Sequence, residues 1–300
     1  MTNTPLAPAR ALALAIEPFA GQVYFAPECH RRYAELGFGL SPGKAGEVEM
    51  PNGPAYFCSR GSVMGQVPGE VIAAAFGVFN PAAVVPAVSY GWTLTDAATI
   101  CAARTDGATQ QLRRILGADP DGVGRAVELL RRATDRLSLS GKPLFAGLVS
   151  QGLPGEPLAD AWRLADRLRE YRGDVHVNAW TTAGFDAVEI GLITELYWGL
   201  PIRTYVRTRA WGDDDLDAAE ERLAGRGLIR DGAFTDAGRA AREAIEVATD
   251  EGCAPIIGAL GDDLDELLTM VGGWSGQVQA AGGYLAGPQD LAALVKIGLG

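Results

Sequence analysis

Apolar side chains recur at spacings of three and four residues along most of this chain of 300 residues. That spacing puts them on one face of a helix, where they can be buried together. Start and stop residues support several boundaries, such as Pro27 before one helix, Gly37 after it and Asp96 before another. The chain is therefore expected to be mainly α-helical, with helices over 9–25, 27–36, 69–78, 96–116, 122–137, 157–171, 262–272 and 288–298.

Three segments depart from this amphipathic pattern. The Gly/Pro-rich stretch from Gly39 to Pro54 predicts a long loop or a short hairpin, and residues 55–64 are interpreted as one extended segment. Residues His176 to Trp198 are apolar on nearly every side, which is typical of the central helix of a bundle. We expect two domains, an N-terminal helical domain (1–150) with the Gly/Pro-rich loop, and a second domain (151–300) with the central helix.

The segment from Trp211 to Asp250 has a pattern of its own. In order, it predicts a helix, a short strand, a tight turn before a second short strand, and a capped helix, at 213–224, 227–229, Asp231-Gly232 and Thr235-Asp236. Asp-Gly between apolar strands is a strong hairpin signal. Helix, two-stranded wing and helix form the second half of a winged helix. The expected fold is thus a helical bundle with a C-terminal winged-helix module carrying a short two-stranded wing.

The charge of the chain restricts its partners. Its formal net charge is −11, from 26 Lys and Arg against 37 Asp and Glu. This charge repels nucleic acid and acidic membrane surfaces, so neither is expected as a partner. No apolar run is long enough for a membrane span and the N-terminus lacks a signal-peptide pattern, so a cytoplasmic location is expected. The four cysteines lack CxxC spacing and are expected to be reduced.

Three segments carry a resemblance to a known family. They are Tyr24-Phe25-Ala26-Pro27-Glu28, Arg172-Gly173-Asp174-Val175-His176-Val177, and the winged segment, in which Glu220 to Ile229 and Thr235 to Arg239 are similar to the recognition-helix end and wing of MarR-type regulators. Together they resemble an actinobacterial helix-turn-helix-like family. The resemblance spans most of the chain and implies a helical fold that contains a MarR-type winged-helix module. This chain departs from the family at Asn80, which precedes Pro81, because the family pattern often has a histidine before this proline.

A winged helix binds duplex DNA through a recognition helix in the major groove and a wing along the phosphates, and both need Lys and Arg. The predicted recognition helix instead begins Asp213-Asp214-Asp215-Leu216-Asp217, and Arg230 is the lone cation at the wing turn. Acidic residues at a helix N-terminus also have a structural explanation, because they favour the helix dipole and cap free amides. In either case the module lacks a surface for DNA.

The motif Arg172-Gly173-Asp174-Val175-His176 is the leading candidate for an active site. Phosphate-binding loops, dinucleotide motifs and nucleophile elbows are missing from the sequence, and two histidines are too few for a multi-histidine metal site. No metal or cofactor is therefore expected. A histidine near a carboxylate can act as a general acid or base, or hold an anionic group. Asp174 and His176 are thus candidate catalytic residues, with an N-cap and a structural histidine as the alternative.

Further polar side chains occur in otherwise apolar surroundings of the N-terminal half. Buried polar groups need partners, so these side chains can converge on one another or on a ligand. Glu28 is a third catalytic candidate, and the candidate ligand-binding residues are Tyr24, His30, Arg60, Asn80 and Trp180. The structural alternatives are that Glu28 favours a helix dipole, and that Arg60 pairs with Glu47 or Glu49.

These observations predict a small-molecule-binding protein on a winged-helix scaffold that has lost DNA binding. It is expected to be a metal-free enzyme of bacterial specialised metabolism that uses positioning and acid/base catalysis. The chain is also similar, without a diagnostic motif, to aziridine-forming cyclases, which implies an intramolecular ring closure. Two alternatives stay open: a ligand-responsive MarR-like transcriptional regulator, and a non-catalytic partner subunit of a biosynthetic complex. Assembly into a homo- or hetero-oligomer is expected.

Overall fold

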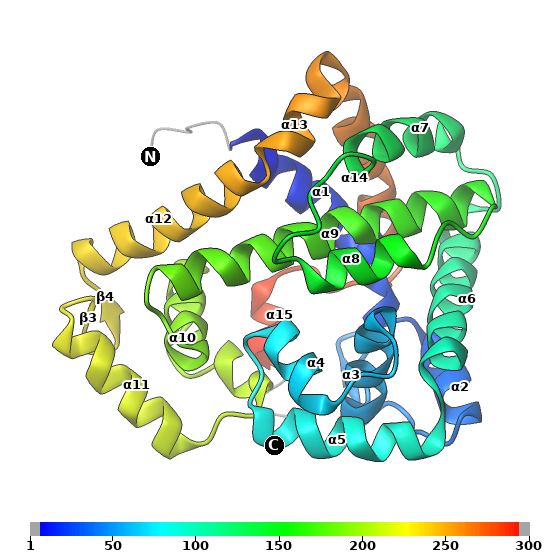
Figure 1. Cartoon of the computed structure of the whole chain (residues 1–300). Helices are drawn as coiled ribbons and strands as arrows, with labels where there is room; N and C mark the ends of the chain where they lie inside the picture. The colour runs from blue at the N-terminus through cyan, green and yellow to red at the C-terminus, as the bar shows by residue number, and fades with distance from the viewer. Residues whose placement is uncertain (1–6, 294–300) are drawn as a thin grey trace.

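The computed structural model describes residues 7–293, with side chains described up to residue 290. Figure 1 shows a helical molecule in which the long helix α9, Pro157–Thr182, crosses the middle. The expectation of a mainly α fold is therefore confirmed. Within the described residues, none of the helices is both long and apolar enough to cross a membrane.

The first part of the chain contains three short helices and one hairpin. In order, the elements are α1 (Pro8–Gly21), the 3₁₀ turn η1 (Gln22–Tyr24), α2 (Pro27–Glu35), strands β1 (Lys44–Ala45) and β2 (Val48–Glu49), α3 (Gly53–Gly61) and the 3₁₀ turn η2 (Ser62–Met64). The Gly/Pro-rich stretch holds the antiparallel β1–β2 hairpin. The extended segment expected at 55–64 is wrong, because Asn52 caps a helix there and accepts a hydrogen bond from the Ala55 amide at 3.3 Å.

Five helices follow before α9. They are α4 (Gly69–Phe76), α5 (Pro81–Leu94), α6 (Ala97–Leu116), α7 (Val123–Thr134) and α8 (Pro143–Ser150). Asp96 caps α6 as expected, because its Oδ1 atom accepts from the Thr99 amide at 2.8 Å. Pro81 occupies the first turn of α5, where its missing amide hydrogen costs nothing, so this proline starts a new helix. Helix α8 is short and was not predicted.

The expected central helix from His176 to Trp198 is wrong. Helix α9 continues through Arg172 and His176 to Thr182, and the break falls later, at Gly184 with a φ of 76°. A new helix, α10 (Ala187–Tyr197), starts at Asp186, whose Oδ1 atom accepts from the Val188 and Glu189 amides at 2.9 and 2.8 Å. The polar residues 172–174 therefore lie inside a helix, because the local capping residues are further along the chain.

The C-terminal part contains the helix-strand-strand-helix order that the sequence predicts. The elements are the 3₁₀ turn η3 (Tyr205–Arg209), α11 (Asp213–Gly225), β3 (Ile229–Arg230), β4 (Ala233–Phe234), α12 (Asp236–Gly252), α13 (Ala254–Leu260), the turn η4 (Gly261–Asp263), α14 (Leu264–Ala280) and α15 (Pro288–Ala293). Strands β3 and β4 pair antiparallel around a turn with positive φ at Asp231 and Gly232. The last predicted helix, 288–298, extends beyond the described residues.

Apolar side chains gather in three clusters. The largest lies between α1, α2, α6, α7, α9 and α14, and Trp162 of α9 is fully buried in it. A second cluster holds α10, α11, the β3–β4 hairpin and α12 together at the left of Figure 1, and includes Trp180 near the end of α9. The third lies under α4 and α5. All four cysteines are buried free thiols.

Candidate functional site

A cavity of about 200 Å³ opens beside the second half of α9. Its α9 wall is one helical stripe, because Arg169, Arg172, Gly173 and His176 are three or four residues apart. Apolar side chains of α1 and α13 form the facing walls, and Arg60 of α3 reaches one end. The complete lining is Ala9, Leu12, Ala13, Ile16, Glu17, Arg60, Leu168, Arg169, Glu170, Arg172, Gly173, His176, Cys253, Ile256 and Ile257.

Glu170 is the centre of an ion network at one end of the cavity. Its carboxylate accepts two hydrogen bonds from Arg60, at 2.9 and 2.7 Å, and one from Arg169 Nη1 at 2.9 Å. Tyr24 donates its hydroxyl to the same carboxylate at 3.1 Å. Burial alone would raise the pKa of Glu170, but the guanidinium groups of Arg60 and Arg169 outweigh it and lower the pKa to about 2. Glu170 is therefore an anion at neutral pH.

Arg172 links the cavity to α12. Its Nη2 atom donates to Glu246 at 2.8 Å and to Asp250 at 3.3 Å. Arg10 of α1 binds the same Asp250, with Nη2 to Oδ2 at 2.8 Å. These pairs fix the position of α12 against α1 and α9. Arg172 therefore lines the cavity and also holds α12, the helix that follows the β3–β4 hairpin.

His176 lines the cavity and has one ring nitrogen without a hydrogen-bond partner among the described residues. Its Nδ1 atom lies 3.0 Å from the Thr249 hydroxyl, which itself donates to the Ile245 carbonyl at 2.7 Å. Because the hydroxyl hydrogen is already used, Nδ1 carries the proton and donates, which leaves Nε2 as an acceptor. Burial and the nearby Arg242 lower the pKa of His176 to about 4, so the ring is neutral near pH 7.

Two guanidinium nitrogens beside the same stripe are also free. Within residues 7–290, Arg169 Nη2 and Arg172 Nη1 make no hydrogen bond, whereas the other nitrogens of Arg169 bind Glu17, Tyr24 and Glu170. Neither free nitrogen is among the buried atoms that lack a partner, so both face accessible space. The residues that line the cavity thus carry two accessible hydrogen-bond donors, on Arg169 and Arg172, and one acceptor without a partner, on His176.

The structure separates Asp174 from His176. Residues two apart on a helix point to different sides, so the expected pairing of this histidine with Asp174 is not present. Asp174 instead caps another helix, because its Oδ2 atom accepts from the Phe145 amide of α8 at 3.0 Å. Burial raises the pKa of Asp174 to about 7, and the charge of Glu170 adds to this effect.

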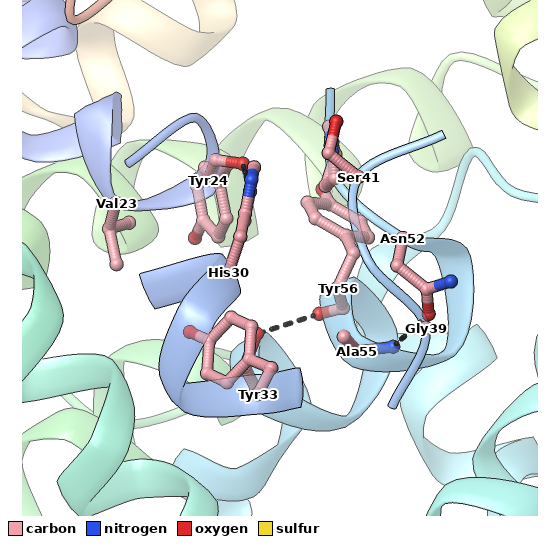
Figure 2. A pocket seen from close by; sticks show the side chains of 11 residues that line it. Val23, Tyr24, His30, Tyr33, Gly39, Ser41, Asn52, Ala55 and Tyr56 are labelled. Carbon is pink, nitrogen blue, oxygen red and sulfur yellow. Dashed lines mark hydrogen bonds between the residues drawn. The ribbon is translucent and has the colours of Figure 1, made fainter. Parts of the chain in front are cut away.

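Tyr24 and His30 border a second, much smaller pocket (Figure 2). In Figure 2 the rings of Tyr24 and His30 lie side by side, and Tyr56 stands across the pocket from them. His30 Nε2 contacts the Tyr24 carbonyl at 3.0 Å, and Nδ1 lies 3.4 Å from Glu49. Tyr24 connects this pocket to the cavity, because its hydroxyl binds Glu170, which lines the cavity.

The remaining predicted residues lie elsewhere or have other partners. Arg60 pairs with Glu170 and not with Glu47 or Glu49, because it lies at the end of helix α3, which the fold brings to Glu170 of α9. Glu28 pairs with Arg114 at 2.7 Å. Asn80 caps α5, accepting from the Ala82 amide at 2.9 Å, and Trp180 belongs to the second apolar cluster. Of the predicted site residues, Arg60 and His176 therefore line the cavity directly.

Sequence reasoning missed Arg169 and Glu170 as site residues, and it assigned no role to Gly173 of the candidate motif. Their stripe depends on one unbroken helix through residue 176, whereas the sequence interpretation ended a helix at 171. Once α9 is continuous, the spacing of Arg169, Arg172 and His176 places them on one face. Among the described residues, no group of three or more His, Cys, Asp or Glu side chains is arranged to hold a metal ion.

Comparison with known proteins gives one match. Neither a curated protein nor a solved structure is significantly similar to this chain. A helix-turn-helix family matches residues 9–285, which include α1, the whole cavity lining and the β3–β4 hairpin. The match covers nearly all of the sequence, and the chain therefore belongs to this helix-turn-helix family.

Proposed function

We propose that this protein binds a small molecule in the cavity between α1, α9 and α13, on a winged-helix-derived scaffold that has lost DNA binding. The observation that carries the proposal is the cavity lining. Apolar side chains of two helices face a stripe with two free guanidinium nitrogens and the bare Nε2 atom of His176. Small-molecule sites have this composition, mostly apolar with a few convergent polar groups.

The winged-helix part of the proposal rests on α10, α11, the β3–β4 hairpin and α12. They share one apolar cluster, with Leu216 and Leu223 of α11 fully buried against α10. Helix α11 then corresponds to a recognition helix and the hairpin to a wing. The connection from α10 to α11 contains η3 and is longer than the turn of three or four residues in ordinary helix-turn-helix proteins.

Loss of DNA binding is supported by the charges on α11. Asp213, Asp214 and Asp215 are exposed at its start, where they would face phosphates. Nearby arginines are already paired: Arg203 with Asp217, and Arg207 with Asp213. Like charges opposite a phosphate backbone reduce affinity, and arginines held by carboxylates cannot compensate without breaking these pairs.

Within this proposal, the reaction class supported by the lining is acid/base catalysis with His176 as the base. A neutral imidazole whose Nδ1 is held by Thr249 presents Nε2 in a fixed direction, which is the arrangement that proton abstraction requires. The narrower form is an intramolecular ring closure, in which the attacking group of the substrate loses its proton to Nε2 and forms the ring bond while the bond to an anionic leaving group of the same substrate breaks. Bacterial specialised metabolism is the setting in which we propose this reaction.

Methyl NMR tests the proposed site. With ¹³C-labelled isoleucine methyl groups, small probes that enter the cavity should shift Ile16, Ile256 and Ile257, which line it. Ile72 and Ile100 lie in other parts of the apolar interior and serve as internal controls. A set of neutral, cationic, anionic and zwitterionic compounds of leucine size is added one at a time. Shifts confined to residues outside the cavity, or no shifts with any compound, would contradict the proposal.

A ligand-responsive regulator is the second candidate. It is favoured by one observation, that Arg172 and His176 line the cavity and also contact α12 of the winged module. A ligand that binds these two side chains would change the packing of α12. The charge of α11 opposes this candidate, and the DNA-binding measurement described in the Discussion distinguishes it from the first.

A further inference from the structure

The packing of α9 does not explain why residue 173 is a glycine. Gly173 lies in the interior of a helix of 26 residues, where glycine is less favourable than alanine because of its backbone entropy. Its φ is not positive, and a Cβ atom placed there would meet only Glu170 Oε2, at 3.6 Å, an ordinary contact. By contrast, Gly107 and Gly147 allow close helix packing, because a Cβ atom there would clash with backbone atoms. The missing side chain at Gly173 instead leaves a hollow in the cavity wall.

Donors and acceptors both surround this hollow. Arg169 and Arg172, with the free nitrogens described above, are the lining residues four and one positions before Gly173, and His176 follows three positions later. On the acceptor side are His176 Nε2 and Glu170 Oε2, the atom that the missing Cβ would contact. A ligand that binds over Gly173 therefore meets groups that suit an anionic head and groups that suit a hydrogen-bond donor.

The network of ion pairs around the cavity contains equal numbers of positive and negative side chains. The ion pairs join five arginines to five carboxylates, namely Arg10, Arg60, Arg169, Arg172 and Arg242 to Glu17, Glu170, Glu243, Glu246 and Asp250. Three of these arginines and two of these carboxylates line the cavity, and partners behind the lining complete the balance. A half-buried charge without an opposite partner is unfavourable, so this neutral network disfavours a ligand that has a net charge. A ligand with one charge of each sign keeps the balance and uses both kinds of group.

From these observations, and resting on the proposed binding function, we infer that the ligand is a zwitterionic amino acid with an apolar side chain. Its carboxylate lies against Arg169 Nη2 and Arg172 Nη1, and its ammonium group lies over Gly173 toward Glu170 Oε2 and His176 Nε2. The apolar side chain fills the space between Leu12 and Ile16 of α1 and Ile256 of α13. The free volume of about 200 Å³ limits this ligand to a small molecule.

Three probes that differ by one group each test the inference. They are L-leucine, 4-methylpentanoate, which lacks the ammonium group, and 3-methylbutylamine, which lacks the carboxylate. Each is titrated while the methyl groups of Ile16, Ile256 and Ile257 are observed. Because a hydrogen bond to a charged group is worth a factor of about ten or more, L-leucine should bind at least about tenfold more tightly than either analogue.

Two glycine variants complete the experiment. Gly173→Ala fills the hollow and leaves every ion pair in place, because its Cβ atom makes only an ordinary contact with Glu170 Oε2. It should weaken L-leucine binding by about tenfold or more, because the ammonium group loses its acceptors. Gly273→Ala in α14 is the matched control, since a Cβ atom there meets nothing within 4 Å. It should bind L-leucine like the unchanged protein.

The outcomes distinguish the amino-acid inference from the proposed binding function. If the analogues bind in the cavity as tightly as L-leucine, or if Gly173→Ala binds L-leucine unchanged, the amino-acid inference is wrong while the small-molecule site remains. If neither L-leucine nor the analogues shift any cavity methyl group, the inference is wrong; if the wider compound set also gives none, the proposed binding function fails too.

Discussion

At the scale of single residues, the most consequential feature is the concentration of charge inside the molecule. Glu170 is 2% exposed and holds two arginines, and Arg104 and Asp166 form a pair of which both members are almost completely buried. Such pairs are not strong stabilisers when formed, because both charges have lost their hydration. Removal of one member is nevertheless costly, since the other stays buried without its partner.

Glu170→Gln should therefore lower the free energy of unfolding by about 3–5 kcal/mol, because Arg60 and Arg169 lose their shared counter-charge. Urea unfolding followed by circular dichroism measures this change. Glu128→Gln is the control, since Glu128 is 70% exposed and its pair with Arg125 lies on the surface. That control should change the stability by less than about 1 kcal/mol. Equal losses in the two variants would contradict the role given to Glu170.

The raised pKa of Asp174 predicts that the stability of the fold depends on pH. The pKa of Asp174 is raised to about 7 in the fold from an ordinary value of 3.8, so the folded state holds this proton more tightly than the unfolded state. The contribution of Asp174 is therefore favourable at low pH and is lost as the pH rises from about 4 through 7. Asn keeps an acceptor for the Phe145 amide but does not titrate.

The Asp174→Asn variant should gain stability relative to the unchanged protein as the pH rises from 4 to 8, by an amount on the order of 3 kcal/mol. Urea unfolding of both proteins across this range gives the difference directly, and other titrating groups cancel because both proteins contain them. A difference that is constant with pH would show that the Asp174 carboxyl group has an ordinary pKa in the fold.

At the scale of elements, α9 supplies one wall of the cavity, and Gly173 is a residue of low helix propensity in its interior. Gly173→Ala and Gly273→Ala should each raise the free energy of unfolding by up to about 1 kcal/mol, because alanine restricts the unfolded chain and introduces no clash at either position. Thermal and urea unfolding measure both. A loss of stability confined to Gly173→Ala would show that the fold itself needs this glycine.

The connection between α10 and α11 depends on one buried carboxylate. Glu195 is fully buried and accepts hydrogen bonds from the amides of Arg203, Thr204 and Val206, the last two at 3.0 Å. Glu195→Gln replaces one acceptor oxygen with a donor, so at least one of these amides loses its partner. We expect a loss of about 1–3 kcal/mol of stability and faster hydrogen exchange at residues 203–206. Unchanged exchange there would contradict this function of Glu195.

At the scale of the whole molecule, the electrostatic field argues against DNA as a partner. The chain has a net charge of −11, and the exposed start of α11 adds carboxylates where a recognition helix needs cations. Fluorescence anisotropy with a labelled duplex of mixed sequence should show no binding at low salt, where phosphate contacts are strongest. Binding that weakens steeply with salt and is lost in Arg230→Ala would favour the regulator instead.

The sequence by itself determined the helical class, most helix positions and the β3–β4 hairpin, because spacing, caps and tight turns act over a few residues. Asp96 and Thr235 are caps of this kind, and both function as predicted. The sequence interpretation was wrong at residues 55–64 and at the end of α9, because it overlooked the local caps Asn52 and Asp186.

Only the tertiary structure decided the site. Arg60 and Glu170 are 110 positions apart, and only the packing of the whole fold brings the end of α3 to Glu170 of α9. The sequence marked His176 and Arg60 as unusual because buried polar groups need partners, but it could not identify those partners. The cavity and its charge balance arise from α1, α3, α9, α12 and α13, which meet only in the folded molecule, and local sequence patterns carry no information about contacts between distant helices.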